Sequence, residues 1–412
     1  MFALIIPIGA LLFGMALLLM GSGLLNTLLA LRGNIEGYND SIIGLIMSGY
    51  FIGFFIGTYL ALPLINRIGH IRTFALCAAL ISSVCLLHIL FVNPYVWILL
   101  RIITGVFLVT LYTVIESWLN GQTSSQHRGK VFSIYMIVNL SSIALAQSLL
   151  RLDTPSSYVL FALSSILITV SLVPVTWTRL AQPKLSKVPR LKLSKIYSVA
   201  PIALVGSAFS GLAMGGFWGM AAIYANHAGL DKNGIATFMT YAILGGVICQ
   251  YPMGRYSDRH DRRKVLAFIS FFASGTAILL ALLSYSGLWI LLGIALYCGF
   301  AFTIYPVAVA HLIDHLDSDN ILSGVSTLLL LYGIGAAVGP ALAGHLMYII
   351  GYQALPFYFF VTQLILTLYI LKKIHIDTEK PEENIAKFVP MVRTTPAALK
   401  MLPDEQTESV NG

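Results

Sequence analysis

Twelve long apolar segments limit the folds that this sequence can adopt. An α-helix needs about 20 apolar residues to cross roughly 30 Å of hydrocarbon, and in lipid it satisfies its backbone polar groups internally. The runs are continuous, without the short alternation of barrel strands. We therefore predict an all-α polytopic membrane protein with transmembrane helices near residues 3–31, 42–64, 73–92, 95–119, 131–150, 157–178, 199–225, 234–253, 265–284, 287–312, 325–349 and 355–372.

The composition excludes most soluble classes of protein. Of 412 residues, 58% are hydrophobic and 10% are charged, whereas about a quarter of a soluble domain is charged. A cytosolic enzyme, a secreted disulfide scaffold and a nucleic-acid-binding domain are excluded on this ground. The four cysteines lie in apolar runs without a CxxC motif, so we expect them to pack between helices.

The basic residues predict the orientation in the membrane. If both termini are cytoplasmic, the inner loops 65–72, 120–130, 179–198, 254–264 and 313–324 hold 15 of the 25 Lys and Arg residues. The tail adds six, and the outer loops hold three, Arg32, Arg151 and Lys232. This asymmetry follows the positive-inside rule and explains the net charge of +8 without a nucleic-acid partner.

Two halves of the chain repeat one pattern. The basic loops 66–72 and 258–264 each follow the second span of a six-span set, and Gly105 and Gly299 recur in the fourth spans. We predict an N-terminal six-helix bundle (1–178), a basic cytoplasmic linker (179–198), a C-terminal six-helix bundle (199–372) and a disordered cytoplasmic tail (373–412). Duplicated halves can rock around a central cavity, which favours alternating access.

The loop motifs resemble those of the major facilitator superfamily, whose inner-loop signature is G-x-x-x-D-R-x-G-R-R-(R/K). The second loop matches at Gly254, Asp258, Arg259, Arg262, Arg263 and Lys264, with Asp261 at the usual glycine. The first loop matches at Arg67, Gly69 and Arg72 but has Asn66 at the acid position. The resemblance implies two six-helix bundles. It also implies a cytoplasmic gate in which Asp258 and Arg259 act with the inner end of span 5 and Arg67 acts with span 11.

Two further segments refine the resemblance. Residues 111–120, with Glu116 and Trp118, and residues 128–132 are similar to the YcaD-like branch of these transporters. Span 5 lacks the Gly-Pro motif of family antiporters. That motif occurs in span 11, at Gly335, Gly339, Pro340 and Gly344, where we expect close helix packing.

Two charged residues lie clearly within the predicted spans, Arg101 and Glu116. A charge at this depth is costly and is a functional candidate by default. At 100° per residue, both share one broad helix face with Gly105 and Tyr112, which we expect to face the cavity. Two structural alternatives stay open. Arg101 could anchor to headgroups, and Glu116 could form a fixed ion pair with Arg128 or Lys130.

Other polar and aromatic residues in the spans could line the path. As a set they predict an aromatic cavity with few charges, suited to a neutral, zwitterionic or singly charged organic solute and poorly suited to a phosphate ester. Each alone could instead serve packing or an interhelical hydrogen bond. The candidates are Asn26, Tyr135, Asn139, Gln147, Trp218, Tyr224, Tyr241, Gln250, Tyr305, His311 and Tyr332.

These patterns predict a monomeric transporter in the bacterial inner membrane that moves a small solute, with proton coupling at Glu116 as an option. A proton-coupled exporter and, more distantly, a non-transporting receptor or scaffold are the alternatives. We expect no enzyme activity and no cofactor, since no GxxxxGK[ST] or GxSxG motif occurs. We expect no metal site either, because His311 and His315 have metal-ligand spacing but no further ligand cluster nearby.

Overall fold

The computed structural model describes residues 2–123, 127–177, 183, 191–283, 287–376, 388–391 and 395, with the backbone alone for residues 2–7 and 318–319. Much of the basic linker and most of the tail lie outside the described residues. The described elements are helices, and no strand occurs among them.

The first half of the chain contains the spans before the linker. They are α1 (Phe2–Ile35), α2 (Asp40–Ile68), α3 (His70–Leu90), α4 (Pro94–Gln122), α5 (Arg128–Leu149), the 3-10 turn η2 (Leu150–Leu152), α6 (Val159–Val170) and α7 (Leu172–Trp177). The second half contains α8 (Leu193–Val199), α9 (Pro201–His227), α10 (Lys232–Ser257), α11 (Arg262–Leu283), α12 (Gly287–Asp314), α13 (Ser318–Ile350) and α14 (Ala354–Ile376).

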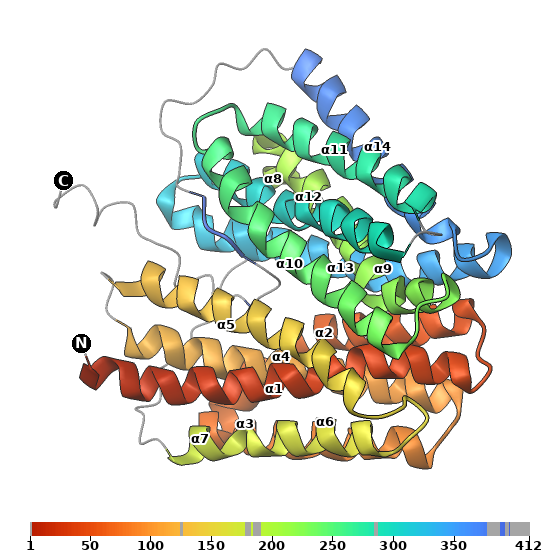
Figure 1. Cartoon of the computed structure of the whole chain (residues 1–412). Helices are drawn as coiled ribbons and strands as arrows, with labels where there is room; N and C mark the ends of the chain where they lie inside the picture. Colours follow the sequence, from red (N-terminus) through yellow and green to blue (C-terminus); the bar gives the residue numbers. More distant parts are fainter. Residues whose placement is uncertain are drawn as a thin grey trace.

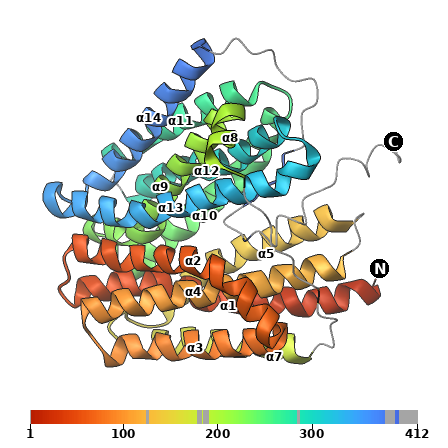
Figure 2. The ribbon, with the colours of Figure 1, turned by 180° about the vertical axis from the view of Figure 1, so that it is seen from behind.

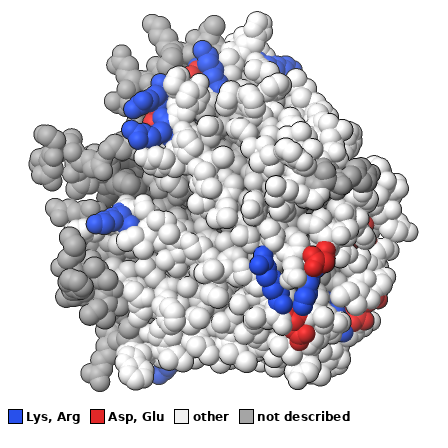
Figure 3. All heavy atoms as spheres, in the orientation of Figure 1, with Lys and Arg blue, Asp and Glu red and all other residues white. Residues whose placement is uncertain are grey.

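The prediction of twelve spans is confirmed. Among the described residues, 12 helical segments are long and apolar enough to cross a bilayer, and each overlaps one predicted span. The sixth span is formed by α6 and α7 together. The chain is therefore an all-α integral membrane protein. On the face in Figure 3, charged side chains lie toward the two ends of the molecule, with a broad uncharged band between them.

Local signals place several helix starts. Asn39 accepts a hydrogen bond from the Ile42 backbone at the start of α2, and Asn93 does the same for Tyr95 and Val96 at the start of α4. These side chains satisfy amide groups that have no partner within the helix. Pro94 suits the first turn of α4, where no amide hydrogen is needed.

Small residues let helices within each half pack at backbone contact. A Cβ atom on Gly105 of α4 would overlap the Tyr50 carbonyl oxygen of α2, and one on Gly245 of α10 would overlap the Ala295 carbonyl oxygen of α12. Glycine is therefore required where these helices cross. The α2–α4 and α10–α12 pairs occupy equivalent places in the two halves, as a duplicated unit implies.

The two halves meet at the end of the molecule that is distant from the start of α1, here called the distal end (Figures 1 and 2). There α2 packs on α13, with Gly44 against Pro340 and Gly344 against Asp40. The Ser48 hydroxyl accepts a 3.0 Å bond from the Ala341 amide. At the other end, here called the terminal end, the helices of the two halves diverge (Figures 1 and 2).

Parts of the predicted linker and tail are ordered in the structure. The helix α8 overlaps the end of the predicted linker, beyond Pro189, and its Ile196 is fully buried. In the tail, residues 388–391 and 395 are placed against the helices, and the Met391 side chain is 3% exposed. The average composition of the tail concealed this short apolar stretch, which includes Phe388, Val389 and Met391.

Candidate functional site

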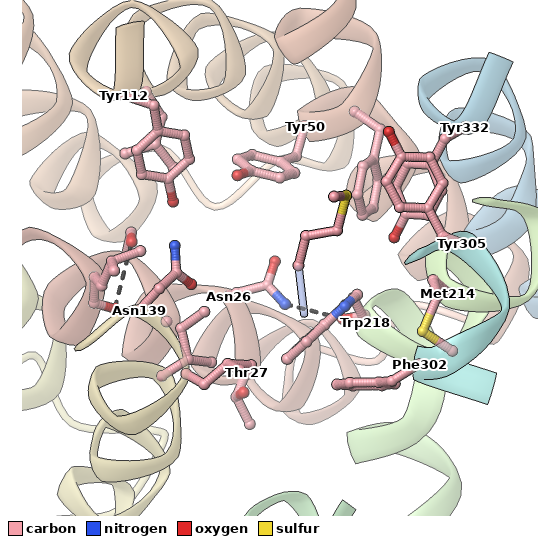
Figure 4. A pocket seen from close by; sticks show the side chains of 18 of the residues that line it. Asn26, Thr27, Tyr50, Tyr112, Asn139, Met214, Trp218, Phe302, Tyr305 and Tyr332 are labelled. Atoms are coloured by element: carbon pink, nitrogen blue, oxygen red, sulfur yellow. Dashed lines mark hydrogen bonds between the residues drawn. The ribbon is translucent and has the colours of Figure 1, made fainter. Parts of the chain in front are cut away.

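A cavity lies between the two halves and is lined by both (Figure 4). Its volume is about 120 Å³, counted as space for the centres of water-sized molecules, and a single buried water needs roughly 10–15 Å³ by that measure. The space therefore suits a small solute. The lining residues are Leu19, Ser22, Gly23, Asn26, Thr27, Tyr50, Phe51, Arg101, Thr104, Leu108, Tyr112, Asn139, Leu140, Ile143, Gln147, Ser210, Met214, Trp218, Phe302, Tyr305, Pro306, Tyr332 and Met391.

Arg101 is the one charged residue among the described residues that line this cavity. Its side chain is 1% exposed. The close approach of α4 to α2 at Gly105 brings the guanidinium carbon to 4.6 Å from the centre of the Tyr50 ring, a cation–π contact. The structure thus places this buried charge beside the cavity.

Asn26 links Arg101 to the opposite half of the protein. The Arg101 Nη2 donates to Asn26 Oδ1 at 2.6 Å, and Asn26 Nδ2 donates to the Trp218 carbonyl oxygen of α9 at 2.9 Å. Figure 4 draws the second bond as a dashed line between Asn26 and Trp218. A group that competes for Arg101 or Asn26 would therefore act on a contact between the halves.

Two hydroxyl groups on the C-terminal side of the cavity have no hydrogen-bond partner among the described residues. They belong to Ser210 of α9 and Tyr305 of α12, which are 1% and 4% exposed. A buried polar group without a partner costs about 1–3 kcal/mol. Water or a solute in the cavity can supply the missing partners.

Glu116 is fully buried on α4, toward the terminal end from the cavity. Its carboxylate accepts hydrogen bonds from the Tyr135 hydroxyl of α5 and from the Thr395 hydroxyl. The Thr395 amide also donates to Glu116 Oε2 at 3.1 Å. Lys130, one of the bases considered as an ion-pair partner, is exposed. The donors to this carboxylate thus include one residue of α5 and one of the tail.

The sequence candidates fall into two groups in the structure. Those that line the cavity are Asn26, Arg101, Tyr112, Asn139, Gln147, Trp218, Tyr305 and Tyr332. The others lie outside the lining: Tyr241 is 43% exposed on the outer surface, Tyr224 donates to the Leu280 carbonyl, Gln250 donates to the Met391 carbonyl, and His311 packs on His315.

The predicted gate residues of the second loop interact within their own half and with the tail. Arg262 donates to Asp314 Oδ2 at 2.6 Å and to Asp258 Oδ1 at 3.4 Å. Arg263 pairs with Asp261 at 3.0 Å, which contributes to a pKa of Asp261 below its usual value even though burial alone would raise it. The remaining gate residues from the signature are Gly69, which joins α2 to α3, and the exposed Arg67, Arg72 and Arg259.

Sequence reasoning missed several cavity residues. Tyr50 carries no charge and lies in a run of aromatic residues, so the sequence does not single it out. Ser210 was hidden in the same way among the small residues of α9. Met391 lies in a tail that composition alone assigns to solvent, although its apolar neighbours Phe388 and Val389 were a usable signal.

Comparison with known proteins gives one consistent family. The family model described as Major Facilitator Superfamily matches residues 11–202 and 203–402. The chain is 28% identical over 344 residues to the "Uncharacterized MFS-type transporter YcaD" of Escherichia fergusonii, which covers 83% of this chain and 89% of that protein. It is 29% identical over 349 residues to the "Uncharacterized MFS-type transporter Ent638_1421" of Enterobacter sp. strain 638, with the same coverage.

Solved structures share the fold. The nucleoside transporter NupG superposes with a TM-score of 0.72 at 12% identity and covers 91% of this chain and 100% of its own. A bacterial homolog to the human lysosomal transporter Spinster, in an inward-facing and occupied conformation, has a TM-score of 0.72 at 15% identity and covers 91% of this chain and 98% of its own.

Proposed function

The chain belongs to the major facilitator superfamily, and we propose that it is a secondary transporter that moves a small organic solute across the inner membrane by rocker-switch alternating access. The main support for this proposal is the cavity, which is lined by residues of both halves. At the distal end the two halves are in close contact. Rigid-body rocking of two related halves changes the side to which such a cavity opens.

The orientation in the proposal places both termini in the cytoplasm. One observation supports it: the described basic loops that join α2 to α3 and α10 to α11 lie at the terminal end, and Lys and Arg favour cytoplasmic loops. With this orientation the conformation described here is inward-facing. The basic linker then meets anionic lipid headgroups of the inner leaflet.

The lining chemistry selects the class of solute. Aromatic rings from both halves offer an apolar surface, and the amides of Asn26, Asn139 and Gln147 offer hydrogen bonds. Arg101 supplies a single positive charge. We therefore propose a solute with an apolar or ring-shaped body and no charge or one negative charge. A multiply charged phosphate ester would leave most of its charge without a partner.

Glu116 carries the coupling proton in this proposal. Burial disfavours a carboxylate unless donors compensate it, and the donors to Glu116 include Tyr135 of α5 and Thr395 of the tail. A donor set that changes as the halves rock would bind the proton in one state and release it in the other. The runner-up, a proton-coupled exporter, uses the same site to drive the solute out of the cell, and an efflux assay against an uptake assay tests for it.

Binding and flux measurements test the proposal in sequence. The purified protein is first screened by thermal shift against neutral, monoanionic and polyanionic metabolites, and we expect stabilisation by members of the first two classes. A stabilising solute is then followed into proteoliposomes, with protein-free liposomes as the control. Binding without any flux in either direction would contradict the transporter and favour the receptor or scaffold alternative.

A pair of variants tests the role of Arg101. Arg101→Gln should abolish the thermal shift by a monoanion, because it removes the single charge of the cavity. Arg101→Lys keeps that charge but loses the planar donors, so it should retain part of the shift. Equal binding of the monoanion by the native protein and Arg101→Gln would assign Arg101 a structural role instead.

A further inference from the structure

A short piece of the C-terminal tail lies between the two halves at the terminal end. We call residues 388–391 together with Thr395 the tail segment. Figure 1 draws residues 388–391 as a short dark-blue strip near α10. Met391 is buried and is one of the residues that line the cavity. The tail segment therefore forms part of the wall of the space that a solute would use.

The tail segment is bound to the C-terminal half by backbone and ring contacts. The Phe388 amide donates to Asp258 Oδ1 at 2.8 Å. The Phe388 ring rests on Gly254 of α10, where any Cβ atom would overlap it. Gln250 donates to the Met391 carbonyl oxygen at 3.5 Å. Gly254 and Asp258 are thus the two signature residues that receive the segment.

The tail segment is bound to the N-terminal half through Glu116. Both the amide and the hydroxyl of Thr395 donate to this buried carboxylate. Hydrogen bonds to a charged group are about twice as strong as neutral ones. The tail therefore bridges α10 and α4 at the end where the halves diverge. It donates hydrogen bonds both to Asp258, the acid of the predicted gate, and to Glu116, the proposed proton site.

Alternating access is incompatible with this bridge. To expose the cavity at the distal end, the halves must close at the terminal end, where the tail segment lies. Glu116 and Asp258 must then exchange their tail partners for others. Resting on the proposed function, we propose that the tail segment is an autoinhibitory plug, which competes with the solute for the cavity and holds the transporter in the conformation that is open at the terminal end.

The first test asks whether the plug is seated in the native protein. This test can be carried out before a solute has been identified. In a Cys249→Ser background, Met391→Cys is alkylated with a water-soluble maleimide, and the exposed Trp177→Cys serves as the control. Because Met391 is 3% exposed and Trp177 is 86% exposed, we expect alkylation at position 391 to be slower by about tenfold or more, as for a site that is open in a tenth or less of the molecules. Equal rates would overturn the plug without affecting the proposed transport function.

The second test asks whether the plug inhibits. The full-length triple variant Phe388→Ala, Met391→Ser, Thr395→Val removes the ring, the buried side chain and the hydroxyl. If the native cavity is blocked nine-tenths of the time, the variant should bind solute about tenfold more tightly, as read from quenching of Trp218 fluorescence. A synthetic peptide of residues 386–397 should restore the native affinity, and a scrambled peptide should not. Unchanged affinity, or equal effects of the two peptides, would overturn the proposal.

Flux separates this proposal from the proposed function. The triple variant should carry solute several-fold faster than the native protein. If neither chain carries a solute that both bind, the proposed function fails, whereas the plug is still decided by the alkylation and affinity results. Equal flux in the native protein and the variant, with tighter binding in the variant, would contradict autoinhibition.

Discussion

At the scale of single residues, the cavity combines one buried charge with hydroxyls that lack partners. The Arg101–Asn26–Trp218 chain is satisfied within the protein, whereas the hydroxyls of Ser210 and Tyr305 make no hydrogen bond with the described residues. Removing a satisfied group and removing an unsatisfied one therefore have different consequences for stability and for binding.

Tyr305→Phe should weaken solute binding and leave the stability of the solute-free protein unchanged or slightly higher. The hydroxyl makes no hydrogen bond with the described residues, so its loss removes no bond within that part of the protein, while a bond to the solute is worth about 0.5–1.5 kcal/mol. Titration of Trp218 fluorescence and thermal unfolding measure the two effects. Tyr297→Phe, a buried tyrosine of the same helix outside the cavity lining, is the control. Equal affinity in Tyr305→Phe and the native protein would remove this hydroxyl from the site.

Glu116→Gln should preserve solute binding and exchange but abolish accumulation driven by a pH gradient. The amide keeps the shape of the side chain and cannot exchange a proton. Tyr135→Phe is the matched control, because it removes one hydrogen-bond donor to the carboxylate and keeps the titratable group. Counterflow and pH-driven uptake in proteoliposomes are the measurements. Normal accumulation by Glu116→Gln would exclude this residue from coupling.

At the scale of elements, glycine positions determine which helices reach backbone contact. On α13, Gly335 and Gly339 face α9, and Gly344 faces the start of α2 in the other half. The Gly-Pro pattern of this span therefore serves close packing. The contact of α13 with α2 is also part of the distal closure between the halves.

Gly344→Ala should weaken the distal closure. Its Cβ atom would overlap the Asp40 carbonyl oxygen, and overpacking of this kind costs about 1–3 kcal/mol. We expect a longer distance between spin labels at Tyr95→Cys and Tyr348→Cys, which are both exposed near the distal end. Gly333→Ala on the same helix is the control, because its Cβ atom would meet nothing within 4 Å. The same distance distribution in both variants would show that α2 and α13 do not limit the closure.

At the scale of the whole molecule, the two halves form a bundle whose ends differ chemically. The start of α1 and the basic loop between α10 and α11 lie at one end, and the helices of the two halves meet at the other (Figure 1). The asymmetry in charge predicts how the protein inserts, and the asymmetry in packing determines where the cavity is closed.

Impermeant labelling tests the orientation. Tyr158→Cys in the distal loop should react in intact cells, whereas Arg259→Cys in the basic loop should react after permeabilisation alone. Both side chains are exposed, so accessibility to water is not the difference between them. Labelling of Arg259→Cys in intact cells would reverse the proposed topology and make the conformation described here outward-facing.

The sequence by itself determined the class of fold, because the cost of placing backbone polar groups in lipid allows few architectures for long apolar runs. It also identified Arg101 and Glu116, since charges at membrane depth are costly and therefore conspicuous. The gate ties across the halves remain a prediction. The tertiary structure alone decided that Tyr50 lies over Arg101, that Ser210 joins Tyr305 at the cavity, and that Thr395 reaches Glu116 from 279 positions away. Such contacts depend on the close approach of helices and on the seating of a short apolar segment in a polar tail, and neither has a periodic pattern in the sequence.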